Sequence, residues 1–507
     1  MDRHSHLPIQ LGLVSIMATF GLIAGTAQST AQTQPRPGPE MRLAGNASPE
    51  FTAVATAVQD AMATFEVPGA VVGVYTEGRK EVATVGVTDI GTNEPVREVT
   101  RFQMGSVNKV YTATAIMRLV EQEEIDLDAP VRDYVPDFSL QDEGAASRVT
   151  VRHLLTHSGG WWGDAFIDTG SGDDAIARYV EEALPRLPQV APVGEHFSYN
   201  NAGFVLLGRV IENVTGDDYR TAMQKLVLDP MGLDSTVFDE SAVLQASYAE
   251  GHGQGADGVE RVTPLSLPRS LEPAGGLWTT IDDQLDFARF HLDQEPTDVL
   301  SSDSIAAMQE PQLPFSGQLG ASMAQPWVTA DLGGRKIVDH EGGTFGQTAK
   351  LTLIPEESFA IAVFTNSQSG SEVGQVALQE ALRQYFDYRP QLGSMGTTDE
   401  EGLPPEIESL GPEALKQYEG RYQIPVGSYL LRVEGSDLIA RYMPLEFAGQ
   451  VKPSNAGAVP QLPPFTVELV AEDIAIVGGA SVIAFQRCDD GNVCWLVEVG
   501  RLYPRRE

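Results

Sequence analysis

Residues 102–122, FQMGSVNKVYTATAIMRLVEQ, are the part of the chain that says most about its fold. Here Ser106 is followed three positions later by Lys109, where apolar residues begin to recur with helical spacing. Residues three apart on a helix share a face, with Cβ atoms about 5–6 Å apart. The chain has only seven lysines and no second S-x-x-K sequence, so the pair raises the question of a chemical role.

The chemistry of this pair depends on the charge of the lysine. A serine hydroxyl is a weak nucleophile until a base takes its proton, and lysine is a base only when neutral. Burial or nearby positive charge must lower the lysine pKa from about 10.4 to near 7, at a cost of roughly 4 kcal/mol. Apolar neighbours such as Val107, Val110 and Ile116 favour burial. The alternative is a helix-capping serine beside an exposed lysine.

Two further motifs contain residue types that such a reaction needs. Tyr199-Asn200-Asn201, the only Y-x-N in the chain, offers a proton-shuttling phenol and an amide that orients a carbonyl. His340-Glu341-Gly342-Gly343 leads into a strand, where glycines would let a substrate backbone lie close. The alternatives are a core tyrosine with a capping asparagine, and a glycine-rich turn.

In this order and spacing, the three motifs resemble those of the penicillin-recognising serine hydrolases. That superfamily includes class C β-lactamases, D,D-peptidases, D-aminopeptidases and related esterases. The stretches 149–160 and 272–290 look similar too, and the resemblance covers roughly residues 50–388. It implies an α+β fold, with an antiparallel sheet flanked by helices and an inserted, mainly helical region.

The resemblance also implies a mechanism and the residues that carry it out. Lys109, helped by Tyr199, would take the proton of Ser106, which attacks a carbonyl to form an acyl-enzyme. The backbone N–H groups of Ser106 and Gly343 would form the oxyanion hole. No cofactor is implied. The substrate-binding residues would be Asn201, His340, Gly342 and Gly343.

Two positions depart from the β-lactamase pattern. His340 stands where β-lactamases usually have lysine, a variant that resembles peptidase, aminopeptidase and esterase members. Asn200 stands where serine is common. We therefore expect a D-amino acid peptide or amide, or a small ester, as substrate in preference to a β-lactam. The alternative function is a non-catalytic peptidoglycan- or peptide-binding protein, but Ser106, Lys109 and Tyr199 are all retained.

Other catalytic classes receive less support from the sequence. His153 and His157 have the spacing of metal ligands on a helix, but no carboxylate or cysteine nearby completes a site, so no metal is expected. The chain lacks H-E-x-x-H and G-x-S-x-G, the motifs of zinc peptidases and α/β-hydrolases.

Length and charge limit the architecture and the partners. A chain of 507 residues is too long for one core, so at least two folding units are expected. The formal net charge of −36 argues against nucleic acid and anionic membrane surfaces as partners. A small molecule or a peptide is the expected substrate.

The first thirty-one residues read as a secretory signal. Arg3 and His4 precede an apolar run, and small residues follow it. We expect a periplasmic or secreted protein with no membrane span in the mature chain. Because the run approaches the length of a span, an uncleaved anchor is the alternative.

The remaining segments divide the chain further. Residues 32–49 are expected to be a flexible lead-in, 50–388 the hydrolase domain, 389–411 a linker and 412–507 an all-β unit. Within the hydrolase domain we predict a hairpin turning at Glu77-Gly78, a hairpin over 350–366 and a helix over 371–386.

The C-terminal unit contains both cysteines. Cys488 and Cys494 flank a short turn, which favours a disulfide across a hairpin; two free thiols are the alternative. The unit resembles the lipocalin-like barrels appended to some superfamily members. That resemblance leaves three roles open: covering the active site, holding a homo-oligomer together, or serving as a passive module. A further possibility is that the unit itself binds an apolar ligand.

Overall fold

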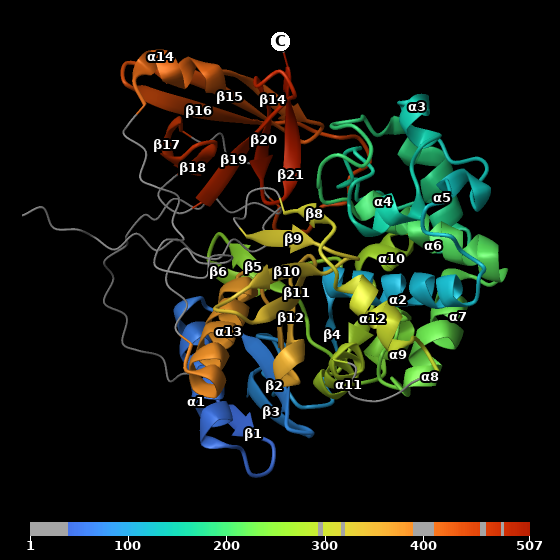
Figure 1. Cartoon of the computed structure of the whole chain (residues 1–507). Helices are drawn as coiled ribbons and strands as arrows, with labels where there is room; N and C mark the ends of the chain where they lie inside the picture. Colours follow the sequence, from blue (N-terminus) through green and yellow to red (C-terminus); the bar gives the residue numbers. More distant parts are fainter. Residues whose placement is uncertain are drawn as a thin grey trace, which may run out of the picture.

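The computed structural model describes residues 39–292, 298–315, 320–388, 410–456, 463–477 and 481–506 (Figure 1). The expected signal segment 1–31 and residues 389–409 of the expected linker lie outside these ranges. Residues Met41–Leu43, inside the expected lead-in, form strand β1 and pair with β3. None of the described helices is long and apolar enough to cross a bilayer.

An antiparallel sheet forms the centre of the hydrolase domain. Its strand order in the described chain is β1-β3-β2-β13-β12-β11-β10-β9-β8. Beyond β1, the strands are β2 (Gly69–Thr76), β3 (Arg79–Gly86), β8 (Leu313–Pro314), β9 (Ala321–Met323), β10 (Val328–Asp331), β11 (Lys336–Gly343), β12 (Thr348–Ile354) and β13 (Phe359–Thr365).

Helices α1 (Pro49–Thr64) and α13 (Gly370–Phe386) pack against each other and against one face of this sheet (Figure 1). Helix α1 begins where the Ser48 side chain accepts a hydrogen bond from the N–H of Phe51. Its buried residues recur three and four positions apart, which is the pattern of a helix with one apolar face. On the other face of the sheet, α11 (Ile281–His291) packs against β2 and β13.

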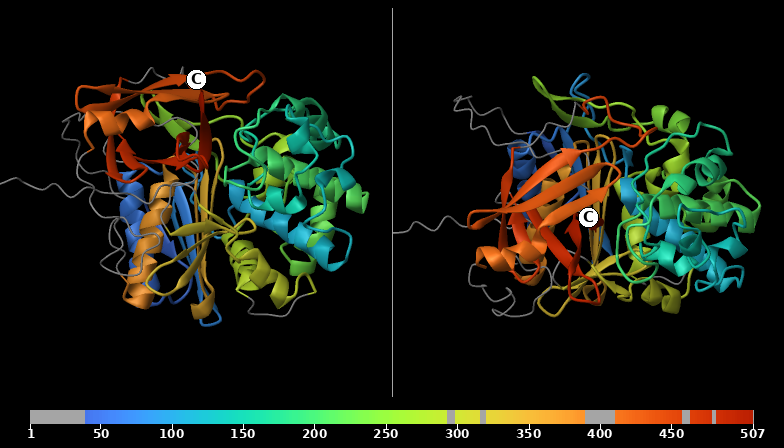
Figure 2. Two further views of the ribbon diagram at one scale, coloured as in Figure 1. Left: turned by 45° about the horizontal axis from the view of Figure 1, so that its top comes forward. Right: turned by 90° about the horizontal axis from the view of Figure 1, so that it is seen from above.

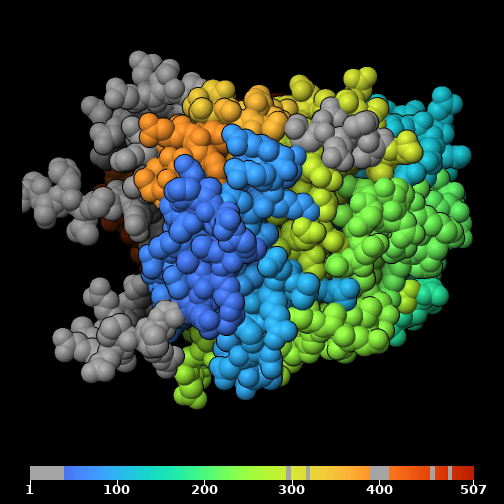
Figure 3. Space-filling model, turned by 90° about the horizontal axis from the view of Figure 1, so that it is seen from below, coloured from blue at the N-terminus to red at the C-terminus, as the bar shows by residue number. Residues whose placement is uncertain are grey.

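The inserted helical region lies beside the sheet (Figure 2, left). Its main helices are α2 (Asn108–Glu121), α4 (Val151–Leu155), α5 (Ala175–Glu182), α6 (Asn201–Thr215), α7 (Tyr219–Met223) and α10 (Glu272–Gly275). Seen from below, α1 and its neighbouring strands lie between α13 and the helical region (Figure 3). The predicted α+β fold is confirmed.

The local predictions within this domain also correspond to elements of the structure. Strands β2 and β3 turn at Glu77 and Gly78, both with positive φ. Strands β12 and β13 form the hairpin predicted over 350–366, and α13 covers the helix predicted over 371–386.

The C-terminal unit is a closed barrel of antiparallel strands. Pairing of the first strand with the last closes it. The disulfide Cys488–Cys494 joins the ends of β19 and β20, with Cα atoms 5.7 Å apart. The strands are β14 (Gly420–Ile424), β15 (Gly427–Glu434), β16 (Asp437–Pro444), β17 (Phe465–Ala471), β18 (Ile474–Val477), β19 (Ser481–Arg487), β20 (Val493–Glu498) and β21 (Arg501–Arg506).

The barrel lies over the hydrolase domain (Figures 1 and 2) and contacts it through specific side chains. The Trp495 indole N–H donates to the carbonyl of Val190 at 2.8 Å. Phe447 packs on Trp162 with ring centroids 4.9 Å apart. The backbone N–H of Tyr199 donates to the Gly500 carbonyl at 2.9 Å, which places the turn between β20 and β21 next to the tyrosine motif.

Candidate active site

Ser106 and Lys109 meet where a short 3-10 turn runs into a helix. Ser106 lies in η1 (Gly105–Val107), and Lys109 is in the first turn of α2. Lys109 is fully buried and Ser106 is 2 % exposed. Their Nζ and Oγ atoms are 2.9 Å apart. The helical spacing in the sequence therefore brings the two functional atoms into hydrogen-bond contact.

Lys109 Nζ has two further partners. It lies 2.7 Å from Oδ1 of Asn201 and 2.7 Å from the carbonyl oxygen of Ala274. Both atoms accept hydrogen bonds only, whereas the Ser106 hydroxyl can donate. A neutral amine has two N–H groups and one lone pair. Three oxygen partners fit an ammonium that donates to all of them, and they equally fit a neutral amine whose lone pair faces the Ser106 hydroxyl.

The surroundings of Lys109 favour the neutral form. Burial is the main cause that lowers its pKa well below the ordinary value; the charge of Arg501 lowers it further, and Asp164 opposes the shift. The rings of Tyr199 and Phe204 lie 5.0 and 5.5 Å from Nζ. A lysine so enclosed can act as a general base near neutral pH.

The tyrosine motif precedes helix α6. The Asn200 side chain caps the helix by accepting from the N–H of Gly203, and Asn201 begins it. The Asn200 side chain therefore has the capping role considered for this motif. Tyr199 is buried, and its hydroxyl has no hydrogen-bond partner of normal geometry among the described residues. Burial raises the Tyr199 pKa, while interactions with Ser106 and Arg501 oppose that rise.

The His157 ring packs against the Tyr199 ring. The two rings stack with centroids 4.3 Å apart. The N–H of Asn200 donates to Nδ1 of His157 at 2.9 Å, which leaves the ring proton on Nε2. Burial lowers the pKa of His157 well below its usual value, so the ring is neutral. The role of His157 is thus to pack against the tyrosine.

His153, the other histidine considered as a metal ligand, lies in a different environment from His157. His153 accepts from the N–H of Thr150 through Nδ1, in the capping box of α4. Across the part of the chain that the structure describes, no three His, Cys, Asp or Glu side chains gather in a way that could hold a metal ion.

His340 lies in β11, near the same centre. Its ring is buried, and Nδ1–H donates to the Glu341 carbonyl at 2.7 Å. Burial lowers the His340 pKa to about 3, so this ring is neutral as well. The protein therefore presents an uncharged imidazole where β-lactamases usually have lysine.

The glycines after His340 have a role that differs from the sequence-based expectation. A Cβ on Gly342 would overlap the carbonyl oxygen of Met104 and lie 3.0 Å from the backbone N of Ser106. A Cβ on Gly105 would lie 2.6 Å from the backbone N of Gly343. Gly342 thus lets β11 approach the protein's own nucleophile turn, rather than only a substrate backbone.

Replacing Gly342 with alanine should lower the free energy of unfolding by about 2 kcal/mol, because the added methyl group displaces η1 or β11. Urea denaturation measures the change. Gly411→Ala is the matched control, because Gly411 has negative φ and open space around its Cβ position. Equal stability of the two variants would contradict the close packing of β11 on η1.

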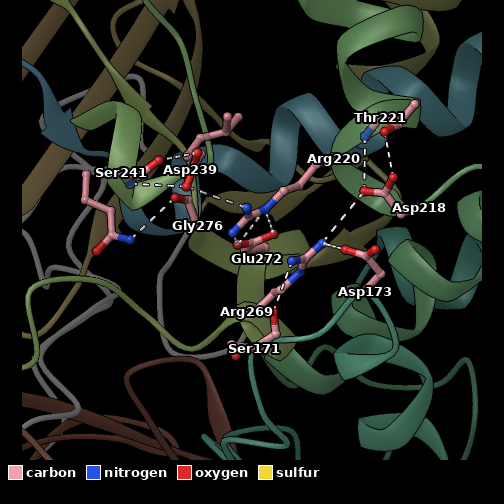
Figure 4. A network of polar contacts seen from close by, with 12 residues as sticks. Ser171, Asp173, Asp218, Arg220, Thr221, Asp239, Ser241, Arg269, Glu272 and Gly276 are labelled. Carbon is pink, nitrogen blue, oxygen red and sulfur yellow. Dashed lines mark hydrogen bonds and ion pairs between the residues drawn. The ribbon is translucent and has the colours of Figure 1, made fainter. Parts of the chain in front are cut away.

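Short helix α10 supplies the Ala274 carbonyl and is held by a polar network (Figure 4). The Arg220 guanidinium forms hydrogen bonds of 2.5–3.1 Å with the buried Glu272 carboxylate. Asn108 Nδ2 donates to the backbone carbonyls of Glu272 and Pro273 at 3.0 and 3.1 Å. The stretch 272–290, noted for its family resemblance, therefore contains the Ala274 carbonyl that contacts Lys109.

Replacing Arg220 with methionine should destabilise the fold by about 3 kcal/mol, since it leaves the Glu272 carboxylate buried without its partner. Burial already raises the Glu272 pKa against the pull of Arg220. A raised pKa costs stability at neutral pH, so the deficit should narrow as pH falls toward the unfolded value near 4.3. Thermal unfolding at several pH values tests this.

The control for this variant is Arg335→Met. Arg335 is as exposed as Arg220, at 30 %, but its partner Glu357 is 38 % exposed rather than 5 %. An exposed pair contributes under about 1 kcal/mol. A similar loss in both variants, or a deficit independent of pH, would argue against a buried anchoring pair.

Sequence reasoning missed three groups that contact the site. The Ala274 carbonyl bonds Lys109, Asp164 bonds the Asn201 amide at 2.7 Å, and Arg501 lies 4.6 Å from the Tyr199 ring. Asn201, expected to bind substrate, is engaged by protein groups at both ends of its amide in this structure. The second N–H of its Nδ2 remains for a ligand.

A buried serine, a buried lysine of lowered pKa, a tyrosine and an oriented amide together define a serine hydrolase. The chain belongs to the beta-lactamase family, whose sequence model matches residues 54–385.

Individual relatives agree with this family. Penicillin-binding protein 4 of Amycolatopsis lactamdurans is 35% identical over 317 residues, which are 61% of this chain and 83% of that protein. The crystal structure of SurE matches with a TM-score of 0.69 and 25% identity, over 90% of this chain and 99% of SurE. An octameric penicillin-binding protein homologue from Pyrococcus abyssi matches with a TM-score of 0.59 and 25% identity, over 88% and 98%.

Proposed function

We propose that this protein is an exported serine hydrolase that forms an acyl-enzyme on Ser106. Its preferred substrates are peptides or amides with a D-amino acid acyl group, or small esters, rather than β-lactams. The observation that carries the proposal is the environment of Lys109: its Nζ lies 2.9 Å from the Ser106 hydroxyl, and burial lowers its pKa well below the ordinary value, which favours the neutral amine. A neutral amine at that distance is positioned to remove the serine proton.

The first chemical step transfers the Ser106 proton to Lys109 as Oγ bonds to the substrate carbonyl carbon. The carbonyl oxygen then needs N–H donors. Thr344 N donates to Gln347 O, so Gly343 and Thr348 form the next, non-hydrogen-bonded pair of the hairpin. The Gly343 N–H is therefore directed away from β12, beside η1. Together with the Ser106 N–H it suits an oxyanion hole.

The second step releases the leaving group and then the acyl group. Tyr199 is buried against Lys109, with its phenol near Ser106, so it can pass a proton from the amine to the departing nitrogen or oxygen. In deacylation the same groups would take a proton from water. The reaction needs no redox change and conserves charge in each step.

The substrate preference follows from His340. Common β-lactam antibiotics carry a carboxylate next to the lactam nitrogen, on the leaving-group side of the reacting carbonyl, and a neutral imidazole provides no charge for it. SurE has also been solved with D-Leu, at a TM-score of 0.69 and 25% identity to this chain. That likeness supports a D-amino acid at the acyl position. Residues 1–31 and the Cys488–Cys494 disulfide support export to an oxidising compartment.

A substrate panel tests the proposal. Purified enzyme is assayed with p-nitroanilides of D- and L-amino acids, p-nitrophenyl esters and a chromogenic cephalosporin. We expect D-anilides or esters to be turned over at least tenfold faster than the cephalosporin. Binding of D-peptides without turnover of any compound would instead support a non-catalytic binding protein. Faster turnover of the cephalosporin would reverse the proposed preference.

We also propose that the enzyme forms a homo-oligomer, because a similar structure from Pyrococcus abyssi is octameric. Light scattering after size-exclusion chromatography measures the mass, and a single-chain mass at micromolar concentration would reject this part of the proposal.

A further inference from the structure

The turn between β20 and β21 of the barrel enters the hydrolase site. The Gly500 carbonyl accepts from the N–H of Tyr199 at 2.9 Å. Arg501, the first residue of β21, is only 3 % exposed. Its guanidinium lies over the Tyr199 ring, 4.6 Å from the centroid. A residue nearly four hundred positions after Ser106 thus contacts the proposed proton-transfer tyrosine.

Arg501 also begins a chain of hydrogen bonds that ends at the nucleophile. Arg501 Nε donates to Asp164 Oδ2 at 2.9 Å, and Nη2 lies 3.3 Å from Oδ1. Asp164 Oδ1 accepts from Asn201 Nδ2 at 2.7 Å. Asn201 Oδ1 in turn accepts from Lys109 at 2.7 Å, and Lys109 contacts Ser106.

This chain determines which way the Asn201 amide faces. A carboxylate can only accept, so Asp164 selects the amide nitrogen and leaves Oδ1 toward Lys109. A reversed amide would place N–H groups against the lysine and remove one of its acceptors. Fixing the amide therefore also fixes the direction of the Lys109 lone pair.

The barrel anchors both ends of this arrangement. The Glu498 carboxylate, just before the turn, accepts from Tyr429 and Tyr503 at 2.6 and 3.0 Å. On the hydrolase side, Gln450 of the barrel donates to the backbone carbonyl of Asp164 at 2.7 Å. Asp164 is thus held by the barrel through both its side chain and its backbone.

We propose that Arg501 is a positioning residue of the hydrolase, which orients Asn201 through Asp164 and supports Tyr199, so that the barrel completes the active site. This inference rests on the proposed function of Ser106 and Lys109. It assigns the C-terminal unit a direct part in the reaction and does not exclude a further role in assembly.

The charges around Lys109 make the proposal measurable as a pH profile. Removing the positive charge of Arg501 leaves Asp164 to act alone, which favours the ammonium form of Lys109. The acid limb of kcat/KM then moves to higher pH. When both charges are removed, their opposing effects on the Lys109 pKa are lost together, so the acid limb returns toward its wild-type position. The titratable groups that face Lys109 are Asp164 from its loop, His157 after α4, Tyr199 before α6, His340 of β11 and Arg501 of β21.

The experiment compares Arg501→Met, Arg501→Lys, Asp164→Asn and the double variant Arg501→Met/Asp164→Asn, with a p-nitrophenyl ester as probe. Arg501→Met should lower kcat/KM by about 10²-fold, because a misplaced catalytic group costs that much. The acid limb of kcat/KM for Arg501→Met should shift to higher pH. The acid limb for the double variant should return toward that of the wild-type enzyme. Arg501→Lys keeps the positive charge, so its acid limb should stay at the wild-type pH while its kcat/KM is reduced. The decreases in kcat/KM caused by Arg501→Met and by Asp164→Asn should not multiply in the double variant, since both residues act through Asn201.

Arg441→Met is the matched control, because Arg441 is an exposed barrel arginine paired with Glu434. It should behave as wild type. An unshifted limb in folded Arg501→Met, or a rate within threefold of wild type, would overturn the proposal. If Arg501→Met does not fold, Asp164→Asn decides: it leaves the Arg501 charge unopposed, so the acid limb should move to lower pH, and an unshifted limb or a rate within threefold of wild type would overturn the proposal. Ser106→Ala is assayed in parallel: if it retains turnover, the proposed function itself fails.

Discussion

Ser106→Ala is expected to lower kcat/KM by roughly 10⁴-fold or more for every compound that the enzyme turns over. The variant removes the only atom that forms the acyl bond, while Lys109 keeps its contacts with Asn201 and Ala274. Turnover and covalent labelling by a fluorophosphonate are measured on the same samples.

The control for this variant is Ser428→Ala, since Ser428 is a fully buried serine in the barrel. It should retain the wild-type rate and labelling. If Ser106→Ala kept more than a small fraction of the activity, the nucleophile would have to be another residue.

Lys109→Met is expected to lower the acylation rate by about 10³-fold, since general-base catalysis contributes roughly 10²–10⁴. Lys109→Arg should be equally impaired, because a guanidinium does not give up its proton in proteins. The rate of p-nitrophenol release in a single turnover measures acylation. Lys225→Met, at an exposed lysine paired with Asp217, is the control and should be unaffected.

The proposed role of Lys109 also predicts the direction in which kcat/KM changes with pH. Activity requires neutral Lys109, so kcat/KM should rise as pH increases through the Lys109 pKa, which burial places well below 10.5. The acid limb should be absent from the residual activity of Lys109→Met. A wild-type limb that persists in this variant would assign the titration to another group.

Much of the fold follows from short-range signals in the sequence. The Glu77-Gly78 turn, the turn of the 350–366 hairpin at residues 355–358 and the apolar spacing of α13 each depend on residues close together in the chain. The arrangement of these elements into one sheet with α1 and α13 on one face depends on contacts between distant segments. That arrangement came from family resemblance rather than from periodicity.

The residues of the site also fall into two groups, those identified from sequence motifs and those identified only in the structure. Ser106, Lys109, Tyr199 and Asn201 were identified by motif, and the structure brings them into contact. Arg501 and Asp164 lacked any local pattern that separates them from other arginines and aspartates of the chain. The Ala274 contact is made by a backbone carbonyl, which no side-chain pattern reveals. The Gly342 position shows that even a recognised motif leaves the reason for a glycine undetermined.

The charge of Lys109 is the central claim, and nuclear magnetic resonance measures it directly. With seven lysines in the chain, the ¹³Cε signals of ¹³C-lysine-labelled protein are few enough to follow, and Lys109→Arg assigns one of them. We predict that the Lys109 signal titrates well below the ordinary lysine value, whereas, against the effect of burial, the carboxylates of Asp339 and Glu341 raise the pKa of Lys350. If Lys109 stays protonated until pH 10, the account is contradicted.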